Sequence, residues 1–231
     1  MWFRLSHLPF FFQLFIVAAL SMIIPSAHAL ALENYAHARA FFYSGLLGLS
    51  LLLMIALAIS NRRMGESGIQ QLTSLALGFL LLPVYLAIPE HDVIKTTDFI
   101  NAYLDMVSAL TTTGFVVFEP ELLPDTIHLW RAVVAWLGGA LIWLVAVAIL
   151  APMNLGGFEV ASGSPTNQTH YLTSNERKLF LNRNFSALLP IYLTLTGVLW
   201  FALTVSGLPG FDSLIFVMSI LSTSGITAVK S

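Results

Sequence analysis

The sequence lacks the residues and motifs on which most enzymes and nucleic-acid-binding proteins depend. It contains no cysteine, which excludes disulfides, thiolate metal sites and a cysteine nucleophile. Only 10% of its 231 residues are charged and its formal net charge is −2, so nothing indicates a nucleic acid as partner. It has neither a GxGxxG nor a Walker loop for a nucleotide. Its six histidines show no HxxxH or HExxH spacing, which argues against a metal site.

Apolar residues make up 57% of the chain. A soluble domain cannot bury that much apolar surface, so we expect the solvent of this protein to be lipid. A helix that crosses the hydrocarbon core needs roughly 20 apolar residues. The stretches that meet this length are approximately Leu8–Leu30, Phe41–Ser60, Ile69–Ile88, Leu129–Met153 and Ser186–Ser206.

Two further apolar stretches, Phe99–Leu110 and Phe211–Leu221, are too short to cross a bilayer. Their length suits a re-entrant helix that enters the membrane and turns back, or a short amphipathic helix on the membrane surface. A loop of hydroxyl residues and one glycine follows each stretch. The two loops are Thr111, Thr112, Thr113 and Gly114, and Ser222, Thr223, Ser224 and Gly225.

The two short stretches and their loops form an internal repeat. Aligning one on the other without gaps pairs Ser108 with Ser219 and Gly114 with Gly225, and it pairs hydroxyl residues at all three positions between the helix and the glycine. Transport proteins often carry such repeats, with the transport site at the repeat interface. The pattern therefore predicts span, short helix and hydroxyl–glycine loop, twice.

The charge distribution predicts that the N-terminus is cytoplasmic. With five crossings, six basic residues then lie inside and four lie outside, and compact basic clusters flank the ends of spans. Both short helices would enter from the outer face. The first apolar run, with Arg4 before it and Ala27-His28-Ala29 after it, also imitates a signal peptide; both a retained first span and a cleaved leader fit the sequence.

Most acidic residues are predicted to lie on the outer side or in the pore loops, where they would attract cations. For Glu119, Glu121 and Asp125, a wet loop explains the charge equally well. The acids predicted on the outer side or in pore loops are Glu33, Glu90, Asp92, Asp98, Asp105, Glu119, Glu121, Asp125 and Asp212.

The two hydroxyl–glycine loops have the chemistry of a filter for a monovalent cation. A dehydrated cation needs a ring of oxygens, which backbone carbonyls of a narrow loop supply. Glycine permits the backbone angles this requires, and the C-terminal dipole of each short helix favours a cation. Asp105 could hydrogen-bond within its helix or attract ions directly. Arg131 could extend to the interface or pair with a pore-loop carbonyl or acid, while Gly138-Gly139 could permit close packing or a kink.

The run from Ser108 to Phe115, SALTTTGF, and the later Trp136-Leu137-Gly138-Gly139 resemble the Trk/Ktr/HKT superfamily of potassium transporters, most closely its Trk members. The resemblance implies an all-α membrane fold of two leading helices followed by span–pore-helix–span repeats. It also implies that the loop glycines favour potassium over sodium, and that Asn101, Asp105 and Asp212 belong to the pore helices. The ranges it implies are 1–66 for the leading helices, 67–157 for the first repeat, 158–185 for a cytoplasmic loop and 186–231 for a second repeat.

Two departures from the family pattern limit what the resemblance implies. The second loop, Ser-Thr-Ser-Gly-Ile, differs from the Ile-Gly-Gly-Phe type expected there, and the sequence stops at Ser231 before the repeat closes. Two loops cannot encircle an ion, so we expect this chain alone not to conduct. It would be a fragment, one part of a split system, or a shortened form that needs partners.

The resemblance implies potassium uptake across the cytoplasmic (inner) membrane of a bacterium, with K⁺ as the transported ion, no cofactor in this chain and no enzymatic activity. The alternative is a non-conducting structural or regulatory membrane subunit derived from such a transporter. Expected partners are the lipid bilayer, the missing C-terminal half or equivalent pore repeats, and a second copy in a homodimer. A cytoplasmic nucleotide-binding regulatory subunit is also implied by the family.

Overall fold

The computed structural model describes residues 10–59, 68–146 and 174–227, and within these ranges all regular elements are helical. This confirms the all-α prediction. The predicted basic residues Arg4, Arg62 and Arg63, and most of the predicted loop at 158–185, lie outside the described ranges. The helices are α1 (Phe10–Ser21), α2 (Ile23–Ala31), α3 (Tyr35–Ile59), α4 (Gly68–Ile94), α5 (Phe99–Leu110), α6 (Asp125–Val145), α7 (Ser174–Val205) and α8 (Gly210–Ser222), with a 3-10 turn at Pro120–Leu122.

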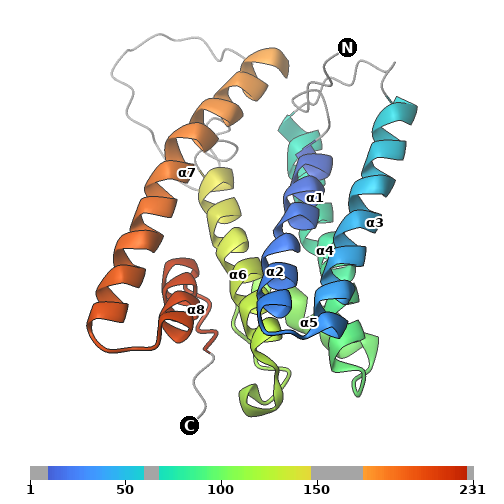
Figure 1. Cartoon of the computed structure of the whole chain (residues 1–231). Coiled ribbons are helices and arrows are strands. Elements are labelled where there is room, and N and C mark those ends of the chain that lie inside the picture. The colour runs from blue at the N-terminus through green and yellow to red at the C-terminus, as the bar shows by residue number, and fades with distance from the viewer. Residues whose placement is uncertain (1–9, 60–67, 147–173, 228–231) are drawn as a thin grey trace.

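Within the described ranges, five helical segments are long and apolar enough to cross a membrane, as the sequence predicts. The first of these spans is made of two helices, α1 and α2, which meet at Met22. Pro25 explains the break, because its missing N–H cannot bond the carbonyl of Ser21. α3, α4, α6 and α7 form the other four, and Figure 1 shows α1 to α4 gathered on one side and α7 on the other.

The two short helices, α5 and α8, correspond to the two short apolar stretches of the sequence. α5 has the predicted bounds, and α8 begins one residue earlier and ends one residue later than predicted. With 12 and 13 residues they are about 18–20 Å long at about 1.5 Å per residue. Neither can cross a hydrocarbon core of about 30 Å, and each turns back within the bundle (Figure 1).

The buried interior is centred on α6. About 67% of the membrane-spanning window of α6 is buried, against 11% for α7, so α6 is the central helix and α7 a peripheral one. The fully buried Trp130 of α6 packs edge-on against Phe41 of α3, with ring centroids 5.4 Å apart, and its indole N–H donates to the Leu86 carbonyl of α4 at 3.2 Å. These contacts join three spans around one aromatic side chain.

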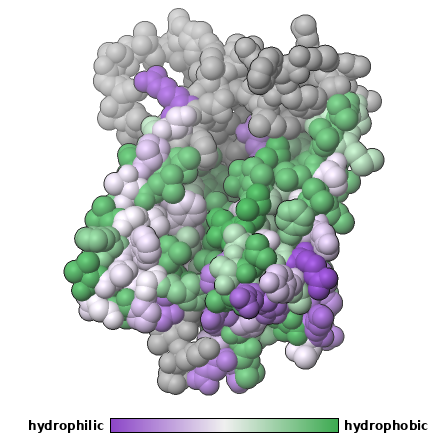
Figure 2. Space-filling model, viewed as in Figure 1, coloured by the Kyte–Doolittle hydropathy of each residue, from purple (hydrophilic) through white to green (hydrophobic). Residues whose placement is uncertain are grey.

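The outer surface of the bundle is apolar. Exposed leucine, isoleucine, valine and phenylalanine side chains lie along α3, α4 and α7. Figure 2 shows apolar residues over much of the visible face, with hydrophilic residues gathered towards the end where α2 turns into α3 and α4 leads to α5. Lipid is the solvent that such a surface needs.

Candidate ion-filter loops

The two short helices end side by side against the middle of α6. A Cβ atom on Gly138 would overlap the Leu110 carbonyl at the end of α5, and one on Gly139 would lie 2.9 Å from Cα of Ser222 at the end of α8. Two adjacent glycines of one helix therefore receive both helix ends. These glycines lie about 20 Å along the axis of α6 from its first residue, Asp125, at about 1.5 Å per residue. Both helices thus end at the same depth, and close packing explains the glycine pair.

The loops after the two helices have the same backbone conformation. Thr112 and Thr223 both have a φ of 55°, and Gly114 and Gly225 have φ values of 72° and 69°. Positive φ is unusual for a β-branched residue and costs about 1–2 kcal/mol relative to the right-handed region. Two threonines with this strain, at equivalent positions of the repeat, show that both loops follow the same strained backbone path.

The backbone hydrogen bonds that end the two helices also match. The N–H of Thr112 donates to the carbonyl of Ala109 at 3.0 Å, and the N–H of Thr113 donates to that of Ser108 at 2.9 Å. This pair of bonds is a Schellman motif, which ends a helix on a left-handed residue. In the second loop the corresponding bonds join Thr223 to Ile220 at 3.1 Å and Ser224 to Ser219 at 3.1 Å.

The hydroxyl groups repeat the same arrangement. The Thr111 hydroxyl donates to the carbonyl of Val107 at 2.7 Å and lies 2.8 Å from the Thr113 hydroxyl. Because its proton goes to the carbonyl, it accepts the proton of Thr113. The matching contacts in the second loop join the Ser222 hydroxyl to the Met218 carbonyl at 2.8 Å and to the Ser224 hydroxyl at 3.0 Å. The hydroxyl residues therefore hold each loop in its left-handed path.

The loop carbonyls remain without donors. Within the described part of the chain, no N–H or O–H group donates to the carbonyls of residues 111–114 or 223–225, whereas the next carbonyl, that of Phe115, accepts the Ser108 hydroxyl at 3.0 Å. Carbonyls at membrane depth need a partner, which is water or a cation where the backbone lines a cavity. The loops thus present oxygen ligands without negative charge.

The two loops also lie in contact with each other. A Cβ atom on Gly114 would overlap the carbonyl oxygen of Ser224, so only glycine fits between the loops. A Cβ atom on Gly225 would meet no described atom within 4 Å. The requirement for glycine at Gly225 therefore comes from its backbone angle, and the requirement at Gly114 comes from both angle and space.

No protein-family model matches the chain, but curated proteins and a solved structure do. It is 30% identical over 151 residues to the Trk system potassium uptake protein TrkI of Halomonas elongata, a match covering 64% of this chain and 28% of that protein. It is 29% identical over 128 residues to TrkH of Salmonella typhimurium, covering 55% of this chain and 26% of that protein. The crystal structure of the potassium transporter TrkH from Vibrio parahaemolyticus matches 99% of this chain with a TM-score of 0.76 and 25% identity.

This chain is similar in sequence and fold to the Trk potassium uptake proteins. It corresponds to the N-terminal half of the family fold, spanning 45% of the Vibrio parahaemolyticus TrkH chain. The resemblance to Trk transporters that the sequence predicts is thereby confirmed.

Arg131 of α6 and Asp105 of α5 form a buried pair. The Arg131 Nε lies 2.8 Å from an Asp105 carboxylate oxygen, and both side chains are almost fully buried. The interpretation of Arg131 as a side chain extending to the interface is wrong, because the guanidinium lies inside the bundle beside an acid on α5. Asp105 likewise faces α6, which favours its structural interpretation over direct attraction of ions.

Asn101 and Asp212 lie far from the loops. Both belong to the first turns of their short helices, about 15 Å from the loops at about 1.5 Å per residue. The Asn101 side chain donates to the Thr97 hydroxyl at 3.1 Å, and Asp212 is half-buried. An acid in the first turn interacts favourably with the helix dipole, so these residues suit helix stability better than ion contact.

Glu90 is the polar residue whose position sequence reasoning missed. The sequence predicts that the span ends at Ile88 and that Glu90 lies beyond it, which is wrong, because Glu90 lies inside α4 with no exposed surface. α4 continues through Pro89 to Ile94, beyond the expected end at Ile88. One available signal was Pro89 itself: a proline in a transmembrane helix need not end it, because neighbouring groups satisfy the freed carbonyl.

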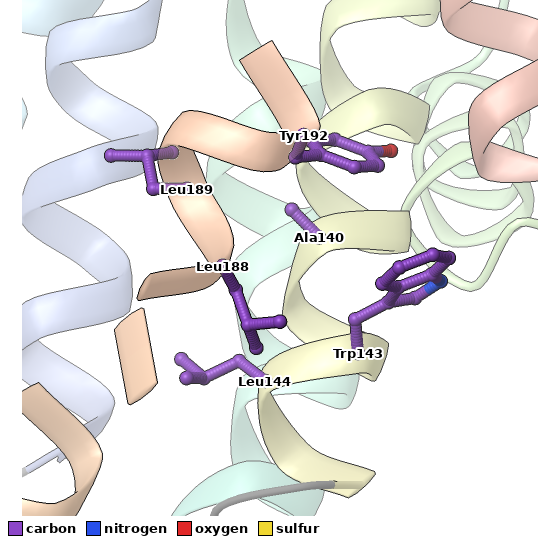
Figure 3. Close-up of a pocket in the computed structure, with 6 residues that line it drawn as sticks. All are labelled: Ala140, Trp143, Leu144, Leu188, Leu189 and Tyr192. Atoms are coloured by element: carbon purple, nitrogen blue, oxygen red, sulfur yellow. The ribbon is translucent and has the colours of Figure 1, made fainter. Parts of the chain in front are cut away.

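A small hollow lies between α6 and α7, next to the glycine pair. Figure 3 shows the side chains around it, which are apolar apart from the Tyr192 hydroxyl and the Trp143 indole nitrogen. That hydroxyl donates to the Trp136 carbonyl at 3.2 Å, so it is engaged within the protein. The hollow therefore lacks the oxygens of a cation site. Its lining residues are Ala140, Trp143, Leu144, Leu188, Leu189 and Tyr192.

Proposed function

We propose that this chain supplies the first two filter loops of a potassium-selective pathway across a bacterial cytoplasmic membrane. The observation that carries the proposal is the row of loop carbonyls without donors, repeated at the ends of two half-length helices that meet mid-bundle. Carbonyl oxygens replace the hydration shell of potassium in channel filters. The relatives are named as potassium uptake proteins, which favours the same ion here.

In this proposal the loops bind the ion without reacting with it. The carboxyl ends of α5 and α8 direct the negative ends of their dipoles at the loops, which stabilises a cation there. The hydroxyls of Thr113 and Ser224 are hydrogen-bonded to the preceding hydroxyl residues, so they shape the loops. The backbone oxygens of residues 111–114 and 223–225 are then the ion ligands. The proposed orientation has the N-terminus in the cytoplasm and both loops reached from outside.

The remaining ligands would come from further pore repeats. Gly114 abuts the Ser224 carbonyl of the next loop, while the corresponding side of Gly225 meets no described atom. A third loop packed against Gly225, as the second loop packs against Gly114, would extend the ring of loops around one axis. Pairing with a second copy, and contact with a cytoplasmic nucleotide-binding regulator, are implied by the family only.

Rubidium uptake tests the proposal. The chain would be expressed in bacteria that lack their own potassium uptake systems, both alone and joined to the part of Vibrio parahaemolyticus TrkH that it does not match. We expect the joined protein to take up rubidium, with little competition from sodium, and the chain alone to take up none. A joined protein that reaches the membrane but carries no rubidium would contradict the proposal and favour a non-conducting subunit.

A further inference from the structure

A cluster of four ionisable side chains is buried behind the first filter loop. Glu90 of α4 and His128 of α6 have no exposed surface, and Asp105 of α5 and Arg131 of α6 are only 1% and 3% exposed. They come from α5 and from the two helices that pack against it, α4 and α6. In the alignment that pairs Gly114 with Gly225, the second repeat has Phe201 and Phe216 at the positions of Glu90 and Asp105. The two acids therefore have no acidic counterpart in the second repeat.

Of the two acids in the cluster, only Asp105 lies within ion-pair distance of Arg131. Arg131 offsets Asp105 at 2.8 Å. The His128 Nε2 lies 2.9 Å from the Pro120 carbonyl, so this nitrogen carries a proton and is engaged by that carbonyl. Glu90 has no N–H or O–H donor on either oxygen among the described residues, and the group beside it is the Asp105 carboxyl.

Two carboxylates in contact cannot both remain charged away from water. An unpaired buried carboxylate costs several kcal/mol, and a carboxyl pair relieves this by keeping one proton, as paired acids in active sites do. The proton belongs on Glu90, because Asp105 is the acid that faces the guanidinium. The neutral carboxyl of Glu90 then donates to Asp105, and Asp105 accepts from both neighbours.

We infer that Glu90 is a positioning residue of the first filter loop, and that it acts as a neutral hydrogen-bond donor to the Asp105–Arg131 pair. That residues 111–114 form a filter loop rests on the proposed function. Asp105 lies less than two helical turns before Thr111, and Arg131 lies about two turns before Gly138, which receives the Leu110 carbonyl. The cluster and the glycine thus hold α5 against α6 at two levels. Together they set where residues 111–114 lie.

Infrared spectroscopy of the purified chain in lipid tests whether Glu90 carries a proton, and this measurement requires no transport activity. A protonated carboxyl group has a C=O stretching band that a carboxylate lacks. We expect this band at neutral pH in the wild-type chain and its loss in Glu90→Gln. The matched control is Asp92→Asn, which removes an exposed acid from the same helix and should leave the band unchanged. An unchanged band in Glu90→Gln would overturn the inference.

Substitution separates the neutral donor from a charged acid. Glutamine keeps the shape and a donor, so Glu90→Gln should melt close to the wild type, whereas Glu90→Ala should melt well below it. In the joined transporter, rubidium-over-sodium preference should survive in Glu90→Gln and fall in Glu90→Ala. A Glu90→Gln variant as impaired as Glu90→Ala would show that Glu90 works as an anion. If neither the joined wild-type transporter nor its variants take up rubidium, the proposed function fails. The infrared band and the melting temperatures would still decide the role of Glu90.

Discussion

The loop at residues 111–114 abuts the second loop at Gly114, and a buried ion pair joins α5, the helix before it, to α6. The loop at residues 222–225 has the same left-handed threonine and glycine, but a Cβ atom on Gly225 would meet no described atom within 4 Å. Its short helix carries phenylalanine where the first carries Asp105. The two loops therefore share a conformation while differing in their support.

The comparison teaches that the loop conformation is set by local sequence. Both loops have a helix-ending pair of backbone bonds and a hydroxyl residue that bonds one turn back and two residues ahead. All of these interactions join residues close together in the chain. The surroundings then determine where each loop sits and how much it can move. Substitutions in matched pairs across the two repeats separate the two effects.

The largest difference should follow loss of the buried ion pair. Arg131→Met leaves two buried acids without their cation, and removing one partner of such a pair costs about 3–5 kcal/mol. The variant should unfold at a much lower temperature in detergent, as measured by the intrinsic fluorescence of the purified chain. Asp212→Asn, in the second short helix, changes a half-buried acid and should shift stability by no more than about 0.5 kcal/mol. Equal losses of stability in Arg131→Met and Asp212→Asn would contradict the claim that the two repeats differ in their support.

Substitution of the loop glycines should have the next largest effect. Serine at either position suffers about 1–2 kcal/mol of backbone strain, but Gly114→Ser also drives a side chain into the Ser224 carbonyl. We expect Gly114→Ser to lower rubidium-over-sodium preference at least about tenfold, which corresponds to about 1.4 kcal/mol, and Gly225→Ser to lower it less. Competition uptake in the joined transporter measures both. Undiminished preference in Gly114→Ser would remove the role given to this glycine.

The glycine pair of α6 offers a test of how the loops are held. Gly138→Ala pushes on the first helix end and Gly139→Ala on the second, and overpacking of this kind costs about 1–3 kcal/mol. Each variant should lower selectivity and thermal stability. Gly197→Ala in α7 meets no described atom within 4 Å and serves as the matched control. The idea fails if Gly197→Ala is as damaging as the other two.

The smallest effect should come from the hydroxyl that braces each loop. Thr111→Val keeps the side-chain shape but removes the bonds to Val107 and Thr113, and a lost hydrogen bond costs about 0.5–1.5 kcal/mol. Melting temperature and ion preference should both fall slightly. Thr204→Val, which removes a similar bond to the carbonyl of Trp200 on exposed α7, should alter melting alone. A selectivity change in Thr204→Val would mean that the loop hydroxyl has no special role.

The parts of the structure that the sequence predicts well are those set by local pattern. Length and hydropathy predict the five spans, and the apolar run of α5 has the predicted bounds. The alignment of the two repeats anticipates the matched φ values of Thr112 and Thr223, since similar local sequences adopt similar turns. The close packing of Gly138 is also confirmed, because a glycine pair in an apolar helix most often permits such contact.

The missed parts depend on contacts distant in sequence or on single residues at helix ends. Glu90 looks like a loop acid until α4, α5 and α6 are brought together around it. Arg131 could face the interface or an acid, and only its distance to Asp105 decides. The start of α6 at Asp125, before the predicted Leu129, was readable from the acid in the first turn after Pro124. Hydropathy alone overlooks such polar first turns.

Direct observation of the ion tests the central claim most sharply. Crystals of the joined transporter grown with thallium in place of potassium would show the cation by its anomalous scattering. The account predicts peaks within coordination distance of the backbone carbonyl oxygens of residues 111–114 and 223–225. Well-ordered loops with no peak beside those oxygens, and thallium bound elsewhere in the bundle, would contradict it.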